Sequence, residues 1–441
     1  MGNLVIPESL QKLQTALHAK AKEEPSFRFY SLYDKLYRAD VLAHAYERCR
    51  ANGGVPGVDG QRFEDIEAYG VERWLGELAQ EVKENGYRPQ AVKRVYIPKP
   101  NGKMRPLGIA TIRDRVAQRA AVLILEPIFE ADLEPEQYAY RPDRNAHAAV
   151  RRVHSLLNTG HTEVIDADLS QYFDSILHSE LLKCVARRVV DGQMLHLLKM
   201  WLEVPEEESD RRGRRRRTTR ARDSKRGIPQ GSPLSPLLSN LYMRRFILGW
   251  KRLGYVLRFG AEIVNYADDL VLCCRRGAKE ALAAMRQLMG RIKLSVNEEK
   301  TRLCRIPEEH FDFLGYTFGR CYSMTGRVYL GTHPSKKSIR RIIAEISAET
   351  TRKTTWLPAE EVVVRLNRKL HGWANYFSLG PVSKAYRAIN AHTTARLRRW
   401  LCRKHKGKGT GRSRYPDSHL HGKLGLVHLP SLTRSLPWAK A

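Results

Sequence analysis

Apolar residues recur at helical spacing along several stretches of this 441-residue chain. Near the N-terminus, Leu10, Leu13 and Leu17 are three and four residues apart, and a second run continues the same spacing. Such spacing gathers the apolar side chains on one face of a helix. We therefore predict helices within residues 1–50, 71–85 and 113–130. Glycine and proline interrupt the pattern at 52–60, which predicts a loop there.

Shorter apolar runs bounded by turn residues are typical of strands. Residues 92–98 alternate between apolar and polar positions, and a turn at 99–103 leads into a second run at 105–109. This arrangement predicts a β-hairpin. We expect a further strand at 161–169, where aliphatic residues and acids alternate.

Two adjacent acids interrupt an apolar stretch in Asn265-Tyr266-Ala267-Asp268-Asp269-Leu270. The aliphatic residues on both sides predict a strand, a tight turn and a second strand, with Asp268 and Asp269 at the turn. A turn can bring both carboxylates to one edge, where they repel each other and lose hydration. A positive group is therefore needed beside them, and either an arginine or a pair of magnesium ions would serve.

Residues 334–403 carry three helical stretches. The middle stretch places Val362, Leu366 and Leu370 on one stripe, which predicts packing against the other two helices. Three basic residues lie off this stripe, namely Arg365, Arg368 and Lys369. We expect a three-helix bundle whose outer face is basic.

The charge of the chain points to a partner. The formal net charge is +30, and an imbalance of this size raises self-repulsion in the folded state. Nucleic acid would neutralise it, and a membrane surface is the competing partner. No apolar run approaches the roughly 20 residues that span a bilayer, and no signal peptide is visible. The seven cysteines include no CxxC pair, which favours a reducing compartment. We expect a soluble, cytoplasmic nucleic-acid-binding protein.

The densest positive charge lies between residues 211 and 226, which hold ten Lys or Arg residues and one Asp. We expect a solvated, mobile loop here. A surface charge run is the simpler interpretation, but the overall charge favours contact with phosphate. The candidate contacts are Arg214, Arg215, Arg216 and Arg217, together with Arg398 and Arg399 near the C-terminus.

A third acid stands at the end of another predicted strand. In Asp166-Ala167-Asp168-Leu169-Ser170-Gln171-Tyr172-Phe173-Asp174, the strand runs directly into a turn rich in aromatic residues. Two-metal phosphoryl transfer needs carboxylates from separate strands that meet at one point, and magnesium prefers oxygen ligands. We predict that an acid of this block joins Asp268 and Asp269 in binding two magnesium ions. A solvated acidic turn is the alternative.

A triphosphate substrate would also need cations and a rigid surface. Lys99 and Arg105 flank a turn, where basic side chains could hold phosphates; a hairpin tip without a ligand is an equal alternative. The segment 227–236 contains three prolines and two glycines. We expect a rigid loop in which Gln230, beside a glycine, allows a ligand to approach the backbone closely. A helix over 237–246 is expected to follow this loop.

Together these motifs resemble the reverse transcriptases encoded by bacterial group II introns. The resemblance rests on Tyr-Ala-Asp-Asp, on the block around Asp168, and on Pro-Gln-Gly before Ser-Pro-Leu-Ser-Pro. Further segments follow in family order, namely Ile97-Pro98-Lys99-Pro100 with Arg105-Pro106-Leu107-Gly108-Ile109, Asn297-Glu298-Glu299-Lys300-Thr301, Phe313-Leu314-Gly315-Tyr316 and Gly372-Trp373-Ala374-Asn375-Tyr376-Phe377.

The resemblance implies an α+β right-hand polymerase, with fingers, a palm built on an antiparallel sheet, and an α-helical thumb bundle. Its parts would be an N-terminal extension (1–60), fingers and palm (61–320), a thumb or maturase domain (330–400) and a short basic DNA-binding-like tail (401–441). The implied activity is RNA-directed DNA polymerisation, with splicing of intron RNA and intron mobility as further functions.

The resemblance also implies roles for single residues. Asp168, Asp268 and Asp269 would hold two magnesium ions, and Lys99 and Arg105 would hold the triphosphate. Gln230 would line the nucleotide pocket, and Phe173 would be the steric gate that excludes a 2′-hydroxyl. The implied partners are intron RNA, an RNA template, a DNA target or primer, and dNTPs.

One feature departs from many members of that family, which end in a His-Asn-His endonuclease with paired cysteines. The region past Trp400 has a single cysteine, Cys402, so we do not expect cleavage of a second DNA strand. Two alternatives stay open, namely a related reverse transcriptase recruited to defence or DNA repair, and an RNA-binding maturase with little polymerase activity. The sequence leaves the oligomeric state open.

Overall fold

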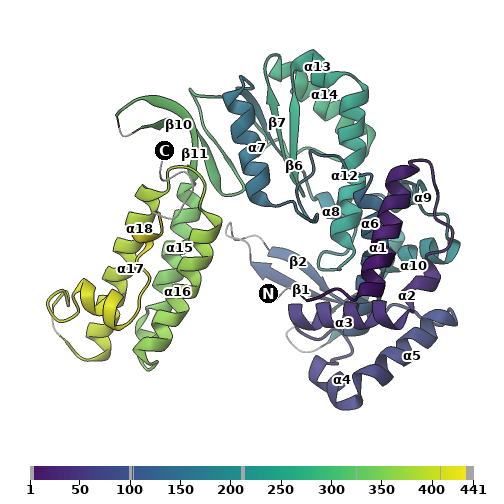
Figure 1. The fold of residues 1–441 in the computed structure, drawn as a ribbon, viewed down its shortest axis with the longest axis horizontal. Coiled ribbons are helices and arrows are strands. Elements are labelled where there is room, and N and C mark those ends of the chain that lie inside the picture. The colour runs from purple at the N-terminus through teal and green to yellow at the C-terminus, as the bar shows by residue number, and fades with distance from the viewer. Residues whose placement is uncertain are drawn as a thin grey trace.

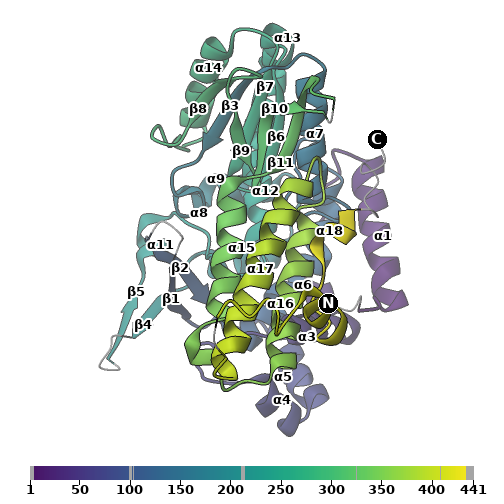
Figure 2. The ribbon, with the colours of Figure 1, turned by 90° about the vertical axis from the view of Figure 1, so that its left-hand side faces the viewer.

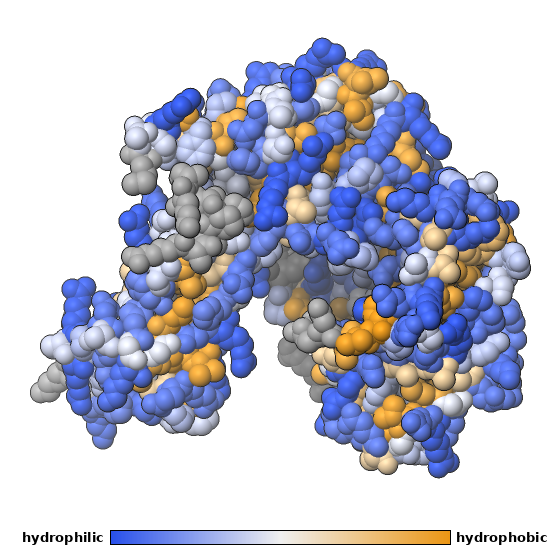
Figure 3. All heavy atoms as spheres, viewed as in Figure 1, coloured by the Kyte–Doolittle hydropathy of each residue, from blue (hydrophilic) through white to orange (hydrophobic). Residues whose placement is uncertain are grey.

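The computed structural model describes residues 4–98, 102, 104–209, 214–323, 325–407 and 409–433. Within these residues the chain is a mixed α+β structure in which helices surround three separate sheets. The ribbon forms an arch, with the N-terminal helices on one side, a helical bundle on the other and two of the sheets above them (Figure 1). Figure 3 shows that the surface between the two arms is hollowed.

Helices form the N-terminal arm, as the apolar spacing predicts. The last of them, α6, is buried along most of its length, and the hydroxyl of Thr111 caps its start by accepting a hydrogen bond from the backbone N–H of Asp114. Both α1 and α3 pack against α6. The helices of this arm are α1 (Glu8–Glu23), α2 (Tyr33–Leu36), α3 (Ala39–Asn52), α4 (Phe63–Tyr69), α5 (Val71–Lys83) and α6 (Ile112–Glu130).

The first sheet has the strand order β2-β1-β4-β5. The predicted hairpin is confirmed, because β1 (Val92–Pro98) pairs antiparallel with β2 (Met104–Ile109). The next strand, β4 (Glu206–Ser209), lies parallel to β1 and is paired antiparallel with β5 (Arg215–Thr218). The hairpin of β4 and β5 projects from the body of the protein (Figure 2).

The prediction of a mobile loop at 211–226 is wrong for the described part of that segment. Residues 215–218 form strand β5, and the short helix α11 (Arg220–Ser224) follows. The partner strand β4 supplies three glutamates, so that the register sets Glu207 opposite Arg217 and Glu208 opposite Arg216. Opposite charges across two strands stabilise their pairing, which a charge run considered by itself does not reveal. Residues 211–213 lie outside the described residues.

The second sheet has the strand order β6-β7-β3-β8 and is antiparallel throughout. We call it the acidic sheet. One face, which includes Ile165 and Leu272, packs into the core around α6 and α12 (Ser235–Arg252). The other face, which includes Val164 and Val271, packs on α7 (Ala146–Asn158). The strands are β3 (Glu163–Asp168), β6 (Glu262–Tyr266), β7 (Asp269–Cys274) and β8 (Arg302–Arg305).

The helices around the acidic sheet include α12, which extends beyond the predicted range of 237–246 at both ends. Its buried residues run from Ser235 to Trp250, so the helix continues as far as its packed face does. The helices are α7 (Ala146–Asn158), α8 (Tyr172–Ser175), α9 (His178–Ala186), α10 (Gly192–Leu202), α12 (Ser235–Arg252), α13 (Tyr255–Phe259) and α14 (Ala278–Arg291).

A third sheet, of strand order β11-β10-β9, connects the acidic sheet to the bundle. Its strand β11 contacts α7. Tyr376, the last residue of α16 (Ala359–Tyr376), donates a hydrogen bond from its hydroxyl to the carbonyl of Leu314, at 2.8 Å. The strands are β9 (Phe311–Phe313), β10 (Tyr316–Tyr322) and β11 (Val328–Pro334).

The three-helix bundle is confirmed. It consists of α15 (Lys336–Glu349), α16 (Ala359–Tyr376) and α17 (Ser383–Lys404), with the stripe of Val362, Leu366 and Leu370 buried inside. After α17 the chain folds back over the bundle through a π-helix (Ser418–Lys423) and α18 (Leu429–Leu432). Leu420 and Leu429 are buried in the same core as the bundle. Among the described residues, no helix has the length and apolar composition needed to cross a membrane.

Candidate functional site

Three acids meet at one end of the acidic sheet. Strands β3 and β7 are antiparallel, and their register sets Asp168 directly opposite Asp269. Across the neighbouring hairpin, Tyr266 is the partner of Asp269, so Ala267 and Asp268 form the turn between β6 and β7. The structure therefore brings together the acids that the sequence analysis selected, although Asp269 is the first residue of a strand and not part of the turn.

The turn that carries Asp268 is held by a buried side chain. Ala267 has a φ of 57°, a left-handed conformation that residues other than glycine seldom adopt. The amide of Asn265 donates hydrogen bonds to the carbonyl of Ala267 at 2.9 Å and to the carbonyl of Asp269 at 3.2 Å. Asn265 was not predicted as a functional residue. It is fully buried just before the acids, and a polar residue at a core position of a strand is the sequence signal for this role.

A cation already contacts the acids. Lys300 donates a hydrogen bond from Nζ to Oδ2 of Asp168 at 2.8 Å, and the amide of Asn297 donates to the same oxygen at 3.0 Å. Both residues belong to a segment that resembles the family, but the sequence predicts no role for either of them. Lys300 therefore supplies positive charge beside the acids, where the sequence had led us to expect an arginine or magnesium ions.

The electrostatics of the site show how closely the acids are grouped. Asp269 is exposed at the surface, but the surrounding protein desolvates its carboxylate, and the charge of Asp268 adds to this effect. Together they raise the pKa of Asp269 to about 7. Desolvation likewise raises the pKa of Asp166 to about 6, with Arg302 opposing the shift and Asp168 adding to it. A site that resists ionisation in this way favours a bound cation.

The donor set suits magnesium, because all of its ligand atoms would be carboxylate oxygens. In the described part of the chain, no three His, Cys, Asp or Glu side chains are already arranged as a metal site. The hydrogen bond from Lys300 occupies one oxygen of Asp168.

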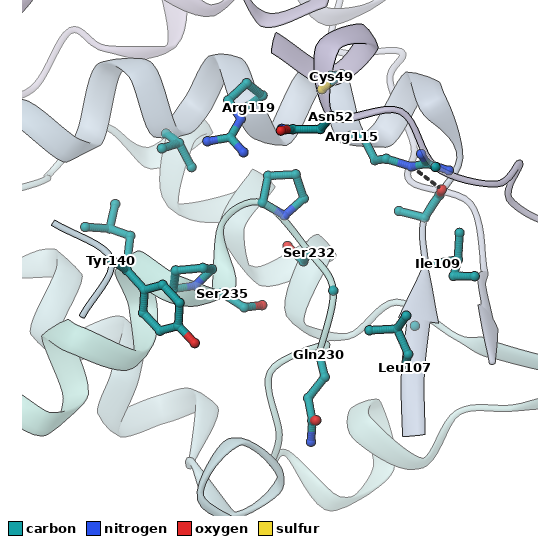
Figure 4. Close-up of a pocket in the computed structure, with 18 of the residues that line it drawn as sticks. Cys49, Asn52, Leu107, Ile109, Arg115, Arg119, Tyr140, Gln230, Ser232 and Ser235 are labelled. Atoms are coloured by element: carbon teal, nitrogen blue, oxygen red, sulfur yellow. Dashed lines mark hydrogen bonds between the residues drawn. The ribbon is translucent and has the colours of Figure 1, made fainter. Parts of the chain in front are cut away.

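A cavity of about 710 Å³ has Tyr140 in its lining, close to the charge of Asp268, although none of the three acids lines it. Its lining includes Arg105, Tyr140, Phe173 and Gln230. Burial, and next the charge of Asp268, raise the pKa of Tyr140, which joins the cavity to the acidic turn. Figure 4 shows Tyr140 and Gln230 on neighbouring walls, with basic side chains of α6 on another wall. Lys99, the other predicted phosphate ligand, lies outside the described residues.

The loop at 227–236 forms one wall of this cavity through close backbone contacts. The N–H of Gly108 in β2 donates to the carbonyl of Gln230 at 2.8 Å. Gly231 has a φ of 110°, and a Cβ atom there would lie 2.7 Å from the carbonyl oxygen of Gly108, so this position requires glycine. The N–H of Ile228 donates to the carbonyl of Phe173 at 2.9 Å. The loop thus joins the two predicted nucleotide-pocket residues, Gln230 and Phe173.

The predicted nucleic-acid contacts lie on separate surfaces. Arg215, Arg216 and Arg217 are exposed on the projecting hairpin, where Arg215 is 3.5 Å from a carboxylate oxygen of Glu207. Arg214 adjoins them in the chain.

The predicted contacts of the bundle differ in their surroundings. Arg365 is ion-paired with Glu361, and Lys369 with Glu349 at 3.5 Å. Arg398 pairs with Asp417, whereas Arg368 and Arg399 are exposed. Ion pairing weakens the case for Arg365, Lys369 and Arg398 as phosphate ligands, because each already has an acidic partner.

Two families account for most of the chain. Residues 97–318 match the family of reverse transcriptases (RNA-dependent DNA polymerases), and residues 339–416 match the maturase-specific domain of group II introns. The acids and most of the residues lining the cavity fall in the first match, and the bundle falls in the second.

Individual proteins give the same result. Protein YkfC of Escherichia coli (strain K12) is 33% identical over 379 residues, which cover 77% of this chain and 96% of that protein. The group II intron-encoded protein LtrA of Lactococcus lactis subsp. cremoris is 25% identical over 437 residues, covering 80% of this chain and 71% of LtrA. The putative COX1/OXI3 intron 1 protein of Saccharomyces cerevisiae is 24% identical over 368 residues, covering 71% of this chain and 43% of that protein. The chain belongs to the reverse transcriptase family, as an RNA-directed DNA polymerase that also carries the maturase domain of group II intron proteins.

Proposed function

We propose that this chain copies RNA into DNA by two-metal nucleotidyl transfer, binds its intron RNA as a splicing maturase, and supports the mobility of that intron. The observation that carries the proposal is the register that pairs Asp168 with Asp269, next to the turn of Asp268 and beside a cavity. An intron RNA, an RNA template, a DNA primer or target, and dNTPs would be its partners.

In this proposal the arch corresponds to the parts of a right-hand polymerase. Residues 1–60 act as an N-terminal extension, 61–320 as fingers and palm, 330–400 as thumb and maturase domain, and 401–441 as a basic tail that contacts DNA. The hollow between the two arms supports this division, since a template–primer duplex needs a groove that ends at the acids (Figure 3).

Each residue of the site has a defined task in the proposed reaction. Asp168, Asp268 and Asp269 hold two magnesium ions, which would supply Lewis acidity at the primer 3′-hydroxyl and at the triphosphate. Asn297 and Lys300 orient Asp168 through its Oδ2 atom.

The cavity residues position the nucleotide. Lys99 and Arg105 bind the triphosphate, Gln230 lines the pocket, and Phe173 lies under the sugar, where its ring leaves no space for a 2′-hydroxyl.

Magnesium binding should depend on pH through Asp269. Its pKa of about 7 in the metal-free protein means that a metal ion must displace a proton below pH 7. We expect the affinity for magnesium to be about tenfold lower one unit below this pKa than one unit above it, with proton release at the lower pH. Titration calorimetry in buffers of different ionisation enthalpy measures both quantities. In the control variant Asp269→Asn, the affinity for magnesium should lose most of its pH dependence. A wild-type magnesium affinity that does not change with pH would contradict the assignment of Asp269 as a metal ligand.

The projecting hairpin provides a test of RNA binding outside the site. Replacing Arg215, Arg216 and Arg217 together by glutamine should weaken RNA binding and reduce the slope of log K against log salt by about 0.7–0.9 for each phosphate that the variant no longer neutralises. The matched control is Glu208→Gln, which removes an acid from the facing strand and should leave binding unchanged or slightly stronger. If the slope is unchanged in the triple variant, the arginines only balance the glutamates of β4.

The proposed function as a whole is tested by primer extension on an RNA template with dNTPs and magnesium, together with splicing of the flanking intron RNA. Both activities are expected. Extension without any effect on splicing would point to a reverse transcriptase recruited to another task, whereas splicing without extension would point to a maturase that has lost polymerase activity.

A further inference from the structure

The loop between α15 and α16 exposes a large aromatic side chain. Trp356 is 78% exposed. The other tryptophans of the described residues are all buried, namely Trp74, Trp201, Trp250, Trp373 and Trp400. The loop lies at the end of the bundle away from the acidic sheet, because α15 begins directly after strand β11 and runs outward (Figure 1). Neither the polymerase site nor the core of the bundle uses this indole.

The loop is held in place on both sides of Trp356. Lys404 of α17 donates hydrogen bonds from Nζ to the carbonyl of Thr355 at 3.0 Å and to the carbonyl of Leu357 at 2.8 Å. The indole N–H of Trp400 donates to the hydroxyl of Thr354 at 3.0 Å. The next residue, Leu357, is buried in the core of the bundle. The exposed indole is therefore presented on an anchored loop, which lowers the entropic cost of binding a ligand against it.

Basic residues lie close to this indole in the chain, and Lys404 contacts the backbone on both sides of it. Arg352 and Lys353 are exposed in the same loop, and Arg403 is exposed at the end of α17, from which Lys404 reaches the loop. The acids nearby in the chain are Glu360 and Glu361 at the start of α16, and Glu361 is ion-paired with Arg365. An aromatic ring flanked by cations suits a ligand that has a flat π-face and attached phosphates.

We propose that Trp356 is a stacking site for an unpaired base of RNA, whose neighbouring phosphates contact Arg352 and Lys353. This inference rests on the proposed function, because it names the structural class of RNA that the maturase domain recognises. An unpaired base in a loop or bulge can stack on an indole, whereas the bases of a continuous duplex are already stacked on each other. The loop lies at the end of the bundle away from the acids, at which the template–primer groove would end.

The experiment uses the full chain with a primer–RNA template already bound, so that the polymerase groove is occupied. A single-stranded oligoadenylate and an RNA duplex of equal length are then titrated by fluorescence anisotropy. We expect Trp356→Ala to weaken binding of the single strand by about 5- to 100-fold, with little effect on the duplex. Trp356→Phe keeps an aromatic face and should stay within a few-fold of the wild type. An unchanged affinity in Trp356→Ala would overturn the proposal.

A second readout reports on this indole alone. The emission of the wild type minus that of Trp356→Phe isolates the exposed tryptophan, and oligoadenylate should quench it and protect it from acrylamide. Absence of quenching in wild-type protein that binds the strand would equally overturn the proposal. Primer extension should be unchanged in both variants, so a failure of extension in the wild type would count against the proposed polymerase function and not against the stacking site.

Discussion

Replacing Asp268 by asparagine is expected to lower the rate of primer extension by at least about a thousandfold, because it removes one carboxylate from the proposed two-metal site. RNA affinity should stay within a few-fold of the wild type, since it comes mainly from many phosphate contacts elsewhere on a chain of net charge +30. Single-turnover extension on an RNA template and a filter-binding titration measure the two quantities on the same preparation.

The matched control for this variant is Asp174→Asn. Asp174 is an exposed acid in the segment that follows Asp168, and it is not among the residues that line the cavity or contact Lys300. Its replacement makes the same chemical change and should leave extension close to wild type. If Asp268→Asn extended primers at the wild-type rate, the assignment of the acids to metal binding would be wrong.

The second large effect concerns the sugar of the incoming nucleotide. Phe173 lines the cavity together with Gln230, and its carbonyl accepts a hydrogen bond from the N–H of Ile228 in the loop that carries Gln230. Phe173→Ala removes the ring that would exclude a 2′-hydroxyl. We expect the preference for dNTPs over rNTPs, measured as the ratio of kcat/KM values, to fall by about 10- to 200-fold.

Two controls separate this effect from damage to the fold. Phe173→Tyr keeps a ring at the same place and should retain the dNTP preference. Phe173 packs against the core around α6 and α12, so thermal unfolding of Phe173→Ala should be measured as well. A lower stability with an unchanged ratio of kcat/KM values would show that Phe173 is a packing residue only.

Local patterns were sufficient for several elements of the fold, but they gave no prediction for others, such as α7, α10 and α14. The spacing of leucines in α1 and the stripe of Val362, Leu366 and Leu370 in α16 predicted helices, because one face of each must be buried. The hairpin of β1 and β2 was likewise predictable from alternation around a turn. The hairpin of β4 and β5 was not, because its stability depends on glutamates that lie several residues before the arginines in the chain.

The candidate site shows where local patterns stop being informative. Motifs alone identified Asp168, Asp268 and Asp269, since adjacent acids in an apolar strand are costly and call for a cation. They assigned no role to Asn265, Asn297 or Lys300, whose functions appear only in their contacts with the acids. The basic face of the bundle was predicted from Arg365 and Lys369, yet both pair with acids. Glu361 lies one helical turn before Arg365, so that pair follows from helical spacing, whereas Glu349 reaches Lys369 from the neighbouring helix α15.

The sequence by itself supplied the candidate acids and a net charge of +30 that favours a polyanionic partner, because charge and residue type are properties of the chain. Only the tertiary structure decided how those residues meet. The register that sets Asp168 opposite Asp269, separated by about 100 residues in the chain, arises from pairing between two strands of one sheet. Lys300 reaches Asp168 from a third segment. Such contacts follow from the packing of distant elements, and no local periodicity records them.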